Sequence, residues 1–242
     1  MSLNTTDKKE IKLFDSLADE WWDEEGSMSF LHSMSEIRTK FILEQLTNKF
    51  QIKNKHKILN DIDILDLGCG GGIASEPLCR LGGNVTGIDE NKKAIFVAKG
   101  HAKISNLNIN YINGDITKKV PNEKFDLITC MEVVEHVENL ELLLQKVRKL
   151  MNKGGVFVGS TINKTITSYI SAIFLAEKIL KIVPENTHSW NKFVKPNMLK
   201  KELLNKNFSQ IKFQGVFYNP LMKNWKYINN KLINYMFSCK VL

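Results

Sequence analysis

The stretch IDILDLGCGGGIASEPLCRLGGNVTGID (residues 62–89) decides the fold. It begins with an apolar run, residues 62–67, which is short enough for a buried parallel strand. Four glycines follow within residues 68–72, and a helical stretch then leads to a second strand at 84–88. Asp89 ends that second strand. Strand, glycine-rich loop, helix, strand and acid, in this order, predict half of a nucleotide-binding βαβ unit.

The spacing of the glycines indicates which ligand the loop binds. Glycines let the backbone turn sharply and approach a ligand where any Cβ would clash. The dinucleotide fingerprint needs a glycine at the sixth position, but counted from Gly68 that position is Ile73. The pattern acid-x-Gly-x-Gly-x-Gly, beginning at Asp66, instead resembles the first motif of class I S-adenosylmethionine (SAM) methyltransferases. We therefore expect a SAM site that includes Gly68 and Gly70, with Asp89 accepting hydrogen bonds from both ribose hydroxyls.

Length and composition predict one cytoplasmic domain. The 242 residues fit a single α/β domain with additions, and we expect one methyltransferase domain over residues 1–242 with a helical cap at 1–50. A hydrophobic fraction of 43% and a charged fraction of 25% are ordinary for a soluble globular protein. No apolar run is long enough to span a bilayer, and the N-terminus lacks the apolar core of a signal peptide. The four cysteines show no metal-ligand pairing, which is typical of reduced core residues.

The net charge of +8 is unevenly distributed. Residues 1–36 carry nine acids and three lysines, whereas residues 141–242 carry seventeen basic and four acidic residues. A basic C-terminal part predicts an anionic partner surface, either nucleic acid or membrane.

The remaining chain alternates between helices and strands. The patterns predict helices at 7–25, 35–50, 91–103, 139–151 and 196–205, a turn at 152–155, and strands at 110–112, 126–130, 156–160, 210–217 and 235–241. Such alternation implies right-handed crossovers. We expect the α/β, Rossmann-like fold of class I SAM methyltransferases. Its seven-stranded, mostly parallel sheet would have helices on both faces, N-terminal helices, a helical insertion after the fifth strand and an antiparallel edge pair.

Three further features are candidates for ligand contacts. Arg38, near a helix start, is unfavourable for the helix dipole, so an acidic group is expected beside it; the SAM carboxylate would serve, and a surface ion pair is the alternative. Asp115 follows the third strand, where this fold usually contacts adenine. The adjacent Trp21 and Trp22 cannot share one helix face, so at least one should pack elsewhere or cover a pocket. Covering the core and contacting a substrate both remain open for them.

Several motifs along the chain together resemble the ubiquinone-biosynthesis O-methyltransferases, the family that makes both O-methylations of the quinone head group. The motifs are Trp21-Trp22-Asp23, Leu31-His32 with Arg38, Thr129-Cys130-Met131-Glu132 with Glu135-His136, Ser160-Thr161-Ile162-Asn163, Val183-Pro184, Thr187-His188, Lys192-Phe193 with Lys195-Pro196, and Tyr218-Asn219-Pro220. Two positions depart from the family pattern. Residues 35–37 are Ser-Glu-Ile where members often carry Asn-Pro-Leu, and Lys164 stands where arginine is common. Both departures could alter packing on the substrate side.

The resemblance implies the cofactor residues and the reaction. SAM would be bound by Arg38, Gly68, Asp89 and Met131, with the polarisable Met131 thioether against the adenine. The expected reaction transfers a methyl group from SAM to a ring hydroxyl of a polyprenylated catechol or hydroquinone in ubiquinone biosynthesis.

The attacking phenol needs activation, because its pKa of about 10 keeps it mostly neutral at pH 7. Glu132, Glu135 and His136 are spaced i, i+3 and i+4, which would place them on one face of a helical turn after the fourth strand. Two carboxylates and an imidazole would bind Mg²⁺ or another divalent metal, and the resemblance points the same way because eukaryotic relatives use this site for a metal. Two alternatives remain open: His136 acting as base without a metal, assisted by Glu135, and a purely structural role. His188 is the second candidate base.

Other functional classes fit less well. A nucleic-acid methyltransferase would usually carry an Asn/Asp-Pro-Pro-aromatic motif where residues 130–133 read Cys-Met-Glu-Val. A scaffold without activity would be expected to lose the glycines or Asp89, and a dehydrogenase is disfavoured by the glycine spacing. A methyltransferase acting on another small molecule or on RNA remains the alternative.

The segment 165–183, TITSYISAIFLAEKILKIV, predicts a membrane contact. Charged residues make it too short to span, but most of its helical circumference is apolar, so it is either buried or laid in a membrane interface. The sheet already has helices on both faces, which favours the interface. We expect residues 165–195 to form a lid that faces an anionic membrane on its inner, cytoplasmic side. Other ubiquinone-biosynthesis proteins are further candidate partners.

Overall fold

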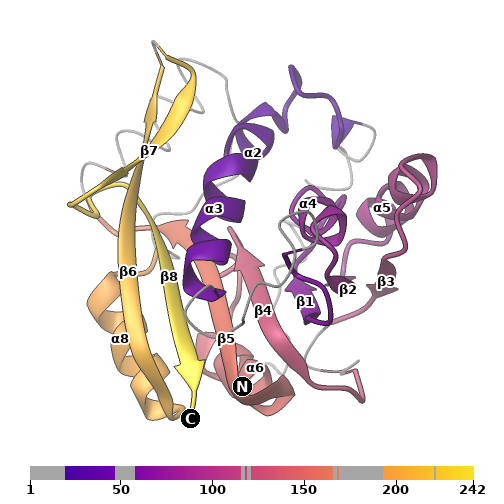
Figure 1. Cartoon of the computed structure of the whole chain (residues 1–242). Helices are drawn as coiled ribbons and strands as arrows, with labels where there is room; N and C mark the ends of the chain where they lie inside the picture. The colour runs from indigo at the N-terminus through magenta and orange to yellow at the C-terminus, as the bar shows by residue number, and fades with distance from the viewer. Residues whose placement is uncertain are drawn as a thin grey trace.

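The computed structural model describes residues 20–46, 58–115, 118, 121–165, 168, 193–220 and 222–242 (Figure 1). The helices are α2 (Ser29–Ser33), α3 (Ser35–Leu46), α4 (Ser75–Arg80), α5 (Lys92–Ile104), α6 (Leu140–Leu150) and α8 (Pro196–Asn205). The strands are β1 (Asp63–Leu67), β2 (Asn84–Asp89), β3 (Asn110–Asn113), β4 (Phe125–Met131), β5 (Met151–Ile162), β6 (Phe208–Asn219), β7 (Asn224–Ile228) and β8 (Asn234–Val241).

Side-chain caps explain where the helices begin. The Asn91 side chain accepts a hydrogen bond from the amide of Ala94 at the start of α5. Asn139 accepts one from Leu142 at the start of α6. Each cap satisfies a backbone donor that the first helical turn leaves unpaired. Pro196 opens α8, where its missing N–H has no cost.

The strands form one sheet in the order β3-β2-β1-β4-β5-β8-β6-β7. The pairs from β3 to β5 are parallel, whereas β8, β6 and β7 join in antiparallel fashion. The mostly parallel sheet is therefore confirmed, but the predicted count of seven strands is wrong. The eighth strand is β7, which pairs antiparallel with β6 and forms the edge (Figure 1).

Apolar clusters cover both faces of the sheet. One cluster joins α6 and α8 to the sheet through residues such as Leu144 and Leu203. The other joins α3 and α4 to the opposite face through Phe41 and Leu78. Burial of each such side chain contributes about 1.5–3 kcal/mol. This two-sided core fixes the parallel strands, so that their carboxyl ends lie at one edge.

Two predicted boundaries differ from the structure. The turn predicted at 152–155 falls within the start of β5, where the pairing with β4 shifts register between Met151 and Val156 and Gly154 adopts a φ of +72°. Residues 20–25 are turns and not the end of the helix predicted at 7–25. The rest of that predicted helix lies outside the described residues, as does most of the segment 165–183.

Across the ranges that the structure describes, no helix is both long and apolar enough to cross a membrane.

Candidate active site

The glycine loop joins β1 to α4 and is held against the end of β2. The amides of Gly68 and Cys69 donate to the carbonyl oxygen of Ile88, at 2.8 and 3.2 Å. Gly68 has a φ of +72°, and a Cβ on it would lie 2.4 Å from a methyl of Val133. Because both the dihedral and the close approach exclude a side chain, glycine is required here.

Asp89 ends β2 and ties the loop to it. Its carboxylate accepts hydrogen bonds from the amides of Gly70, at 2.9 Å, and of Asn91, at 2.8 Å. Burial raises the pKa of the Asp89 carboxyl above its ordinary value, and the two amides oppose that shift. The Asp89 side chain is partly exposed at the carboxyl end of β2, the position from which the sequence predicts a ribose acceptor.

Asp66, the acid of the loop motif, has a structural task. Ser75 donates to one of its oxygens at 2.5 Å, and Thr129 donates to the other at 2.8 Å. The carboxyl is buried, and that burial raises its pKa. Asp66 therefore links the start of α4 to β4 beneath the loop, and its oxygens are engaged within the protein.

Trp21 and Trp22 pack against the glycine loop. The Trp21 ring packs so closely that a Cβ on Gly70 would lie 2.3 Å from it. Trp22 donates its indole N–H to the carbonyl oxygen of Gly71 at 3.0 Å and stacks on His101, with centroids 3.5 Å apart. Both tryptophans thus pack on the cofactor loop. In the sequence, only the adjacent pair of tryptophans indicated that a ring would cover part of the protein. The pair alone did not indicate that this part is the glycine loop.

The segment that carries the tryptophans is fixed by two histidines. A ring nitrogen of His32, on α2, lies 2.8 Å from the carbonyl oxygen of Trp21. His101, on α5, lies 2.6 Å from a carboxylate oxygen of Glu76, at the start of α4. Trp21 and Trp22 are therefore tied to α2 through His32 and to α5 and α4 through His101.

Arg38 projects from the first turns of α3 and is buried. One terminal nitrogen lies 3.3 Å from a carboxylate oxygen of Glu132 and 3.2 Å from the sulfur of Met34. Sequence reasoning predicted an acidic partner, and this partner is Glu132. The alternative of a surface ion pair is wrong, because both side chains are largely buried. Within the described residues the Nε of Arg38 has no hydrogen-bond partner.

Glu132 and Glu135 do not share the predicted face of a helical turn. Glu132 has a φ of +53°, and only residues 134–136 form a turn before α6 begins at Leu140. The left-handed residue breaks the helical spacing on which the prediction depended. The amide of Glu132 instead bonds to Ser160 on β5, whose hydroxyl donates to the Glu132 carboxylate.

Glu135 is buried behind Glu132. Thr161 donates to one of its carboxylate oxygens at 2.7 Å, and the other has no hydrogen-bond partner among the described residues. Burial, together with the charge of Glu132, raises the pKa of the Glu135 carboxyl well above its ordinary value. Both effects favour the protonated form of Glu135. His136 follows in the same turn, its amide bonded to the carbonyl oxygen of Val133 at 2.9 Å.

The described residues do not assemble the predicted metal site. Within them, no group of three histidine, cysteine, aspartate or glutamate side chains is arranged to hold a metal ion. Glu132 is engaged by Arg38 and Ser160, and Glu135 is buried with a raised pKa. Glu132, Glu135 and His136 as placed here thus do not fit a three-ligand Mg²⁺ site, and the metal stays a prediction.

Two other predicted cofactor residues lie along the same edge. Met131, the last residue of β4, is buried in the cluster that contains Met34 and Ile37. Asp115 follows β3 and is buried, and the amide of the preceding Gly114 donates to the carbonyl oxygen of Asp89. The loop, Asp89, Met131 and Asp115 therefore lie at the carboxyl ends of β1 to β4. His188 lies outside the described residues.

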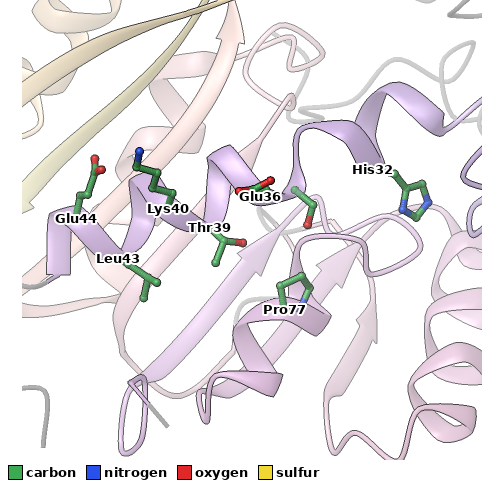
Figure 2. A pocket seen from close by; sticks show the side chains of 8 residues that line it. His32, Glu36, Thr39, Lys40, Leu43, Glu44 and Pro77 are labelled. Carbon is green, nitrogen blue, oxygen red and sulfur yellow. The ribbon is translucent and has the colours of Figure 1, made fainter. Parts of the chain in front are cut away.

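A groove of about 790 Å³ runs along α3 and is also lined by His32 of α2 and Pro77 of α4 (Figure 2). Its lining residues are His32, Ser35, Glu36, Thr39, Lys40, Leu43, Glu44 and Pro77. None of the predicted cofactor or catalytic residues lines it.

Comparison with known proteins identifies the family. A family model described as a methyltransferase domain matches residues 58–231. A ubiquinone biosynthesis O-methyltransferase of Pelagibacter ubique is 43% identical over 97% of this chain and 98% of its own length. The mitochondrial ubiquinone biosynthesis O-methyltransferase of Rattus norvegicus is 39% identical over 96% of this chain and 68% of its own length. The chain belongs to this family.

Solved structures share the fold of this ubiquinone biosynthesis O-methyltransferase family member. A magnesium protoporphyrin IX methyltransferase from Synechocystis, with SAH bound, has a TM-score of 0.65 at 17% identity and covers 96% of this chain and 95% of its own. A SAM-dependent methyltransferase from Thermotoga maritima also has a TM-score of 0.65, at 12% identity, and covers 96% and 99%. The predicted family, enzyme class and fold are confirmed.

Proposed function

We propose that this enzyme transfers the methyl group of SAM to a ring hydroxyl of a polyprenylated catechol or hydroquinone, in both O-methylation steps of ubiquinone biosynthesis. The observation that carries the proposal is the extent of similarity to the named relatives. The 43% identity to the Pelagibacter relative extends over 97% of the chain, so the similarity includes the residues proposed to bind the substrate as well as the glycine loop.

The described residues fit SAM. A buried guanidinium whose Nε has no partner among them suits the carboxylate of the cofactor, so Arg38 would hold that end. Asp89 would accept the ribose hydroxyls, and Met131 and Asp115 would flank the adenine. Gly68 and Gly70 would let the loop backbone come close to the bound cofactor. When bound, SAM supplies an electrophilic methyl group on a sulfonium, which is a good leaving group.

The chain's own contribution is to position the phenol and remove its proton. His136, in the turn after β4, is the proposed base, and His188 is the second candidate. Because burial and the charge of Glu132 raise the pKa of the Glu135 carboxyl, Glu135 would assist His136 through a hydrogen bond and would not itself be the base. Ser160 and Thr161 fix the two carboxyl groups, which keeps this wall of the site rigid.

A divalent metal such as Mg²⁺ is the alternative way to stabilise the phenolate. Extensive chelation should leave SAM affinity unchanged, because the residues proposed to bind SAM are Arg38, Asp89 and the glycine loop. Turnover in metal-analysed enzyme with and without added Mg²⁺ then decides between the metal and His136 alone.

The substrate class is tested with purified enzyme, SAM and a catechol carrying a short prenyl chain. Mass spectrometry should find one added methyl group on a ring oxygen, and the doubly methylated catechol should accept none. Methyl transfer to RNA but not to the catechol would contradict the proposal.

We also propose that the enzyme is peripheral on an anionic membrane through residues 165–183, with other ubiquinone-biosynthesis proteins as partners. The basic C-terminal part and a polyprenyl tail that keeps the substrate in the bilayer support this.

A further inference from the structure

The β6–β7 hairpin extends past the carboxyl edge of the sheet. β6 pairs with β8 up to the register Val216 to Asn234, and Asn234 lies opposite Ile162, the last residue of β5. Residues 217–219 and their β7 partners, 224–226, therefore continue beyond the other strands (Figure 1). The hairpin overhangs the edge at which the cofactor residues gather.

An aromatic cluster fixes the hairpin to α2. The Trp225 ring lies 5.0 Å from that of Phe30 and 5.4 Å from that of Tyr218, measured between centroids. Its indole N–H donates to the Ser33 hydroxyl at 2.9 Å. Because these contacts hold one face of the hairpin against α2, the opposite face is fixed in a direction away from α2.

Apolar and cationic side chains are exposed on the hairpin and on the loop that follows it. Met222 is 63% exposed, Leu232 49% and Phe217 43%. Lys223, Lys226 and Lys231 lie between them in the sequence, and no acidic residue follows Glu202 in the chain. The hairpin and this loop themselves thus carry apolar and cationic side chains and no acidic one; the neighbouring acid Glu44, on α3, accepts a hydrogen bond from Tyr227 of β7.

The same surface adjoins the start of the segment 165–183. The amide of Asn163 donates to the carbonyl oxygen of Ile233 at 2.7 Å, and the hydroxyl of Thr165 donates to that of Leu232. The chain therefore enters that segment directly beside the exposed Leu232.

We propose that the hairpin tip (residues 217–226) and the loop 229–233 form a second contact surface for an anionic lipid bilayer. This rests on the proposed function, in which the substrate is held in the membrane. Apolar side chains would enter the headgroup region while the neighbouring lysines meet anionic lipids. The contact would turn the carboxyl edge of the sheet, and hence the active site, toward the bilayer.

The test uses the full chain with Met222→Glu, Lys223→Glu and Lys226→Glu combined. Its matched control combines Met198→Glu, Lys149→Glu and Lys153→Glu, which changes the charge equally. Met198 is 60% exposed on α8, and both control lysines are exposed near the opposite end of β5. Partitioning is measured by sedimentation with vesicles of phosphatidylcholine, with and without phosphatidylserine.

The hairpin variant should partition at least about tenfold more weakly into vesicles containing phosphatidylserine, and the control should match wild type. Methylation of a short-chain, water-soluble catechol should be unchanged in both. Wild-type partitioning by the hairpin variant, or equal loss in the control, would overturn the proposal, as would absence of binding by the wild type itself. A failure to methylate the soluble catechol would instead contradict the proposed function, so the two are separable.

Discussion

Asp89 has two tasks, because its carboxylate holds the loop amide of Gly70 and is the proposed acceptor for the ribose. Hydrogen bonds to a charged group contribute about 1.5–3 kcal/mol each. Asp89→Ala should therefore lower SAM affinity about a hundredfold by calorimetry, and Asp89→Asn should fall between it and wild type. Asp63→Ala, which removes an exposed carboxylate at the start of β1, is the control and should bind SAM normally. Unchanged SAM binding by a folded Asp89→Ala variant would refute this assignment.

Glu135 should make the stability of the protein depend on pH. Because burial raises its pKa, the folded state binds the proton more tightly than the unfolded state. Its contribution to stability is then fully present below the ordinary glutamate pKa and is lost as pH rises through the raised value. Glu135→Gln, which cannot ionise, should lose less stability than wild type between pH 5 and 8.5.

Thermal unfolding in chelator-containing buffer measures this effect. The control is Glu141→Gln, which removes an exposed carboxyl whose pKa is lowered by its hydrogen bond to Lys206, so its contribution has the opposite sign. Identical pH profiles for wild type and Glu135→Gln would contradict the burial argument.

At the scale of elements, residues 20–32 close over the glycine loop. Trp22→Phe removes the N–H donated to Gly71, worth about 1 kcal/mol, and Trp22→Ala also removes the stacking on His101, worth about 0.5–1.5 kcal/mol. If this cover holds the loop in its binding conformation, SAM affinity should fall about fivefold for the phenylalanine and tenfold or more for the alanine variant. Trp225→Phe, which loses a similar bond to Ser33 away from the loop, should bind SAM as wild type does. Equal SAM affinity in all four proteins would show that the cover does not support the loop.

The sequence predicted those elements whose signals are local. The loop of residues 68–72 and the helices α5 and α8 follow from glycines, caps and an initial proline, and their bounds agree within one residue. The strand β7, Asn-Trp-Lys-Tyr-Ile, was not predicted, because it contains a lysine and half-exposed side chains and has no continuous apolar run. The contacts of the candidate site could not be predicted either, because they join residues that are far apart in the sequence. Nothing near Arg38 in sequence indicates Glu132, and nothing in the motif indicates that Glu132 adopts a left-handed conformation, which breaks the helical spacing assumed for the predicted metal ligands.

At the scale of the whole molecule, acidic and basic residues are concentrated in different parts of the chain. The acidic residues concentrate in the first 36 positions and the basic ones in the last hundred. A basic surface next to an apolar segment favours an anionic bilayer, because cations attract its lipids and apolar side chains enter its interface.

The segment 165–183 should supply most of the membrane affinity. It lies largely outside the described residues, so the argument rests on its sequence. Its apolar face would bury roughly six side chains at about 1.5 kcal/mol or more each, offset by the entropy of ordering the segment. Phe174→Glu combined with Leu175→Glu should abolish flotation with anionic liposomes, and salt should weaken the flotation of wild type.

A matched control separates apolar burial from charge. Thr167→Glu combined with Ser171→Glu adds the same negative charge to the segment without removing an apolar side chain, so it should retain more flotation than the Phe174 and Leu175 variant. SAM binding should be retained in both, because neither pair lies among the proposed cofactor residues. If the Phe174 and Leu175 variant still floats with the liposomes as wild type does, this segment is not the anchor, and the hairpin surface would have to hold the enzyme at the membrane.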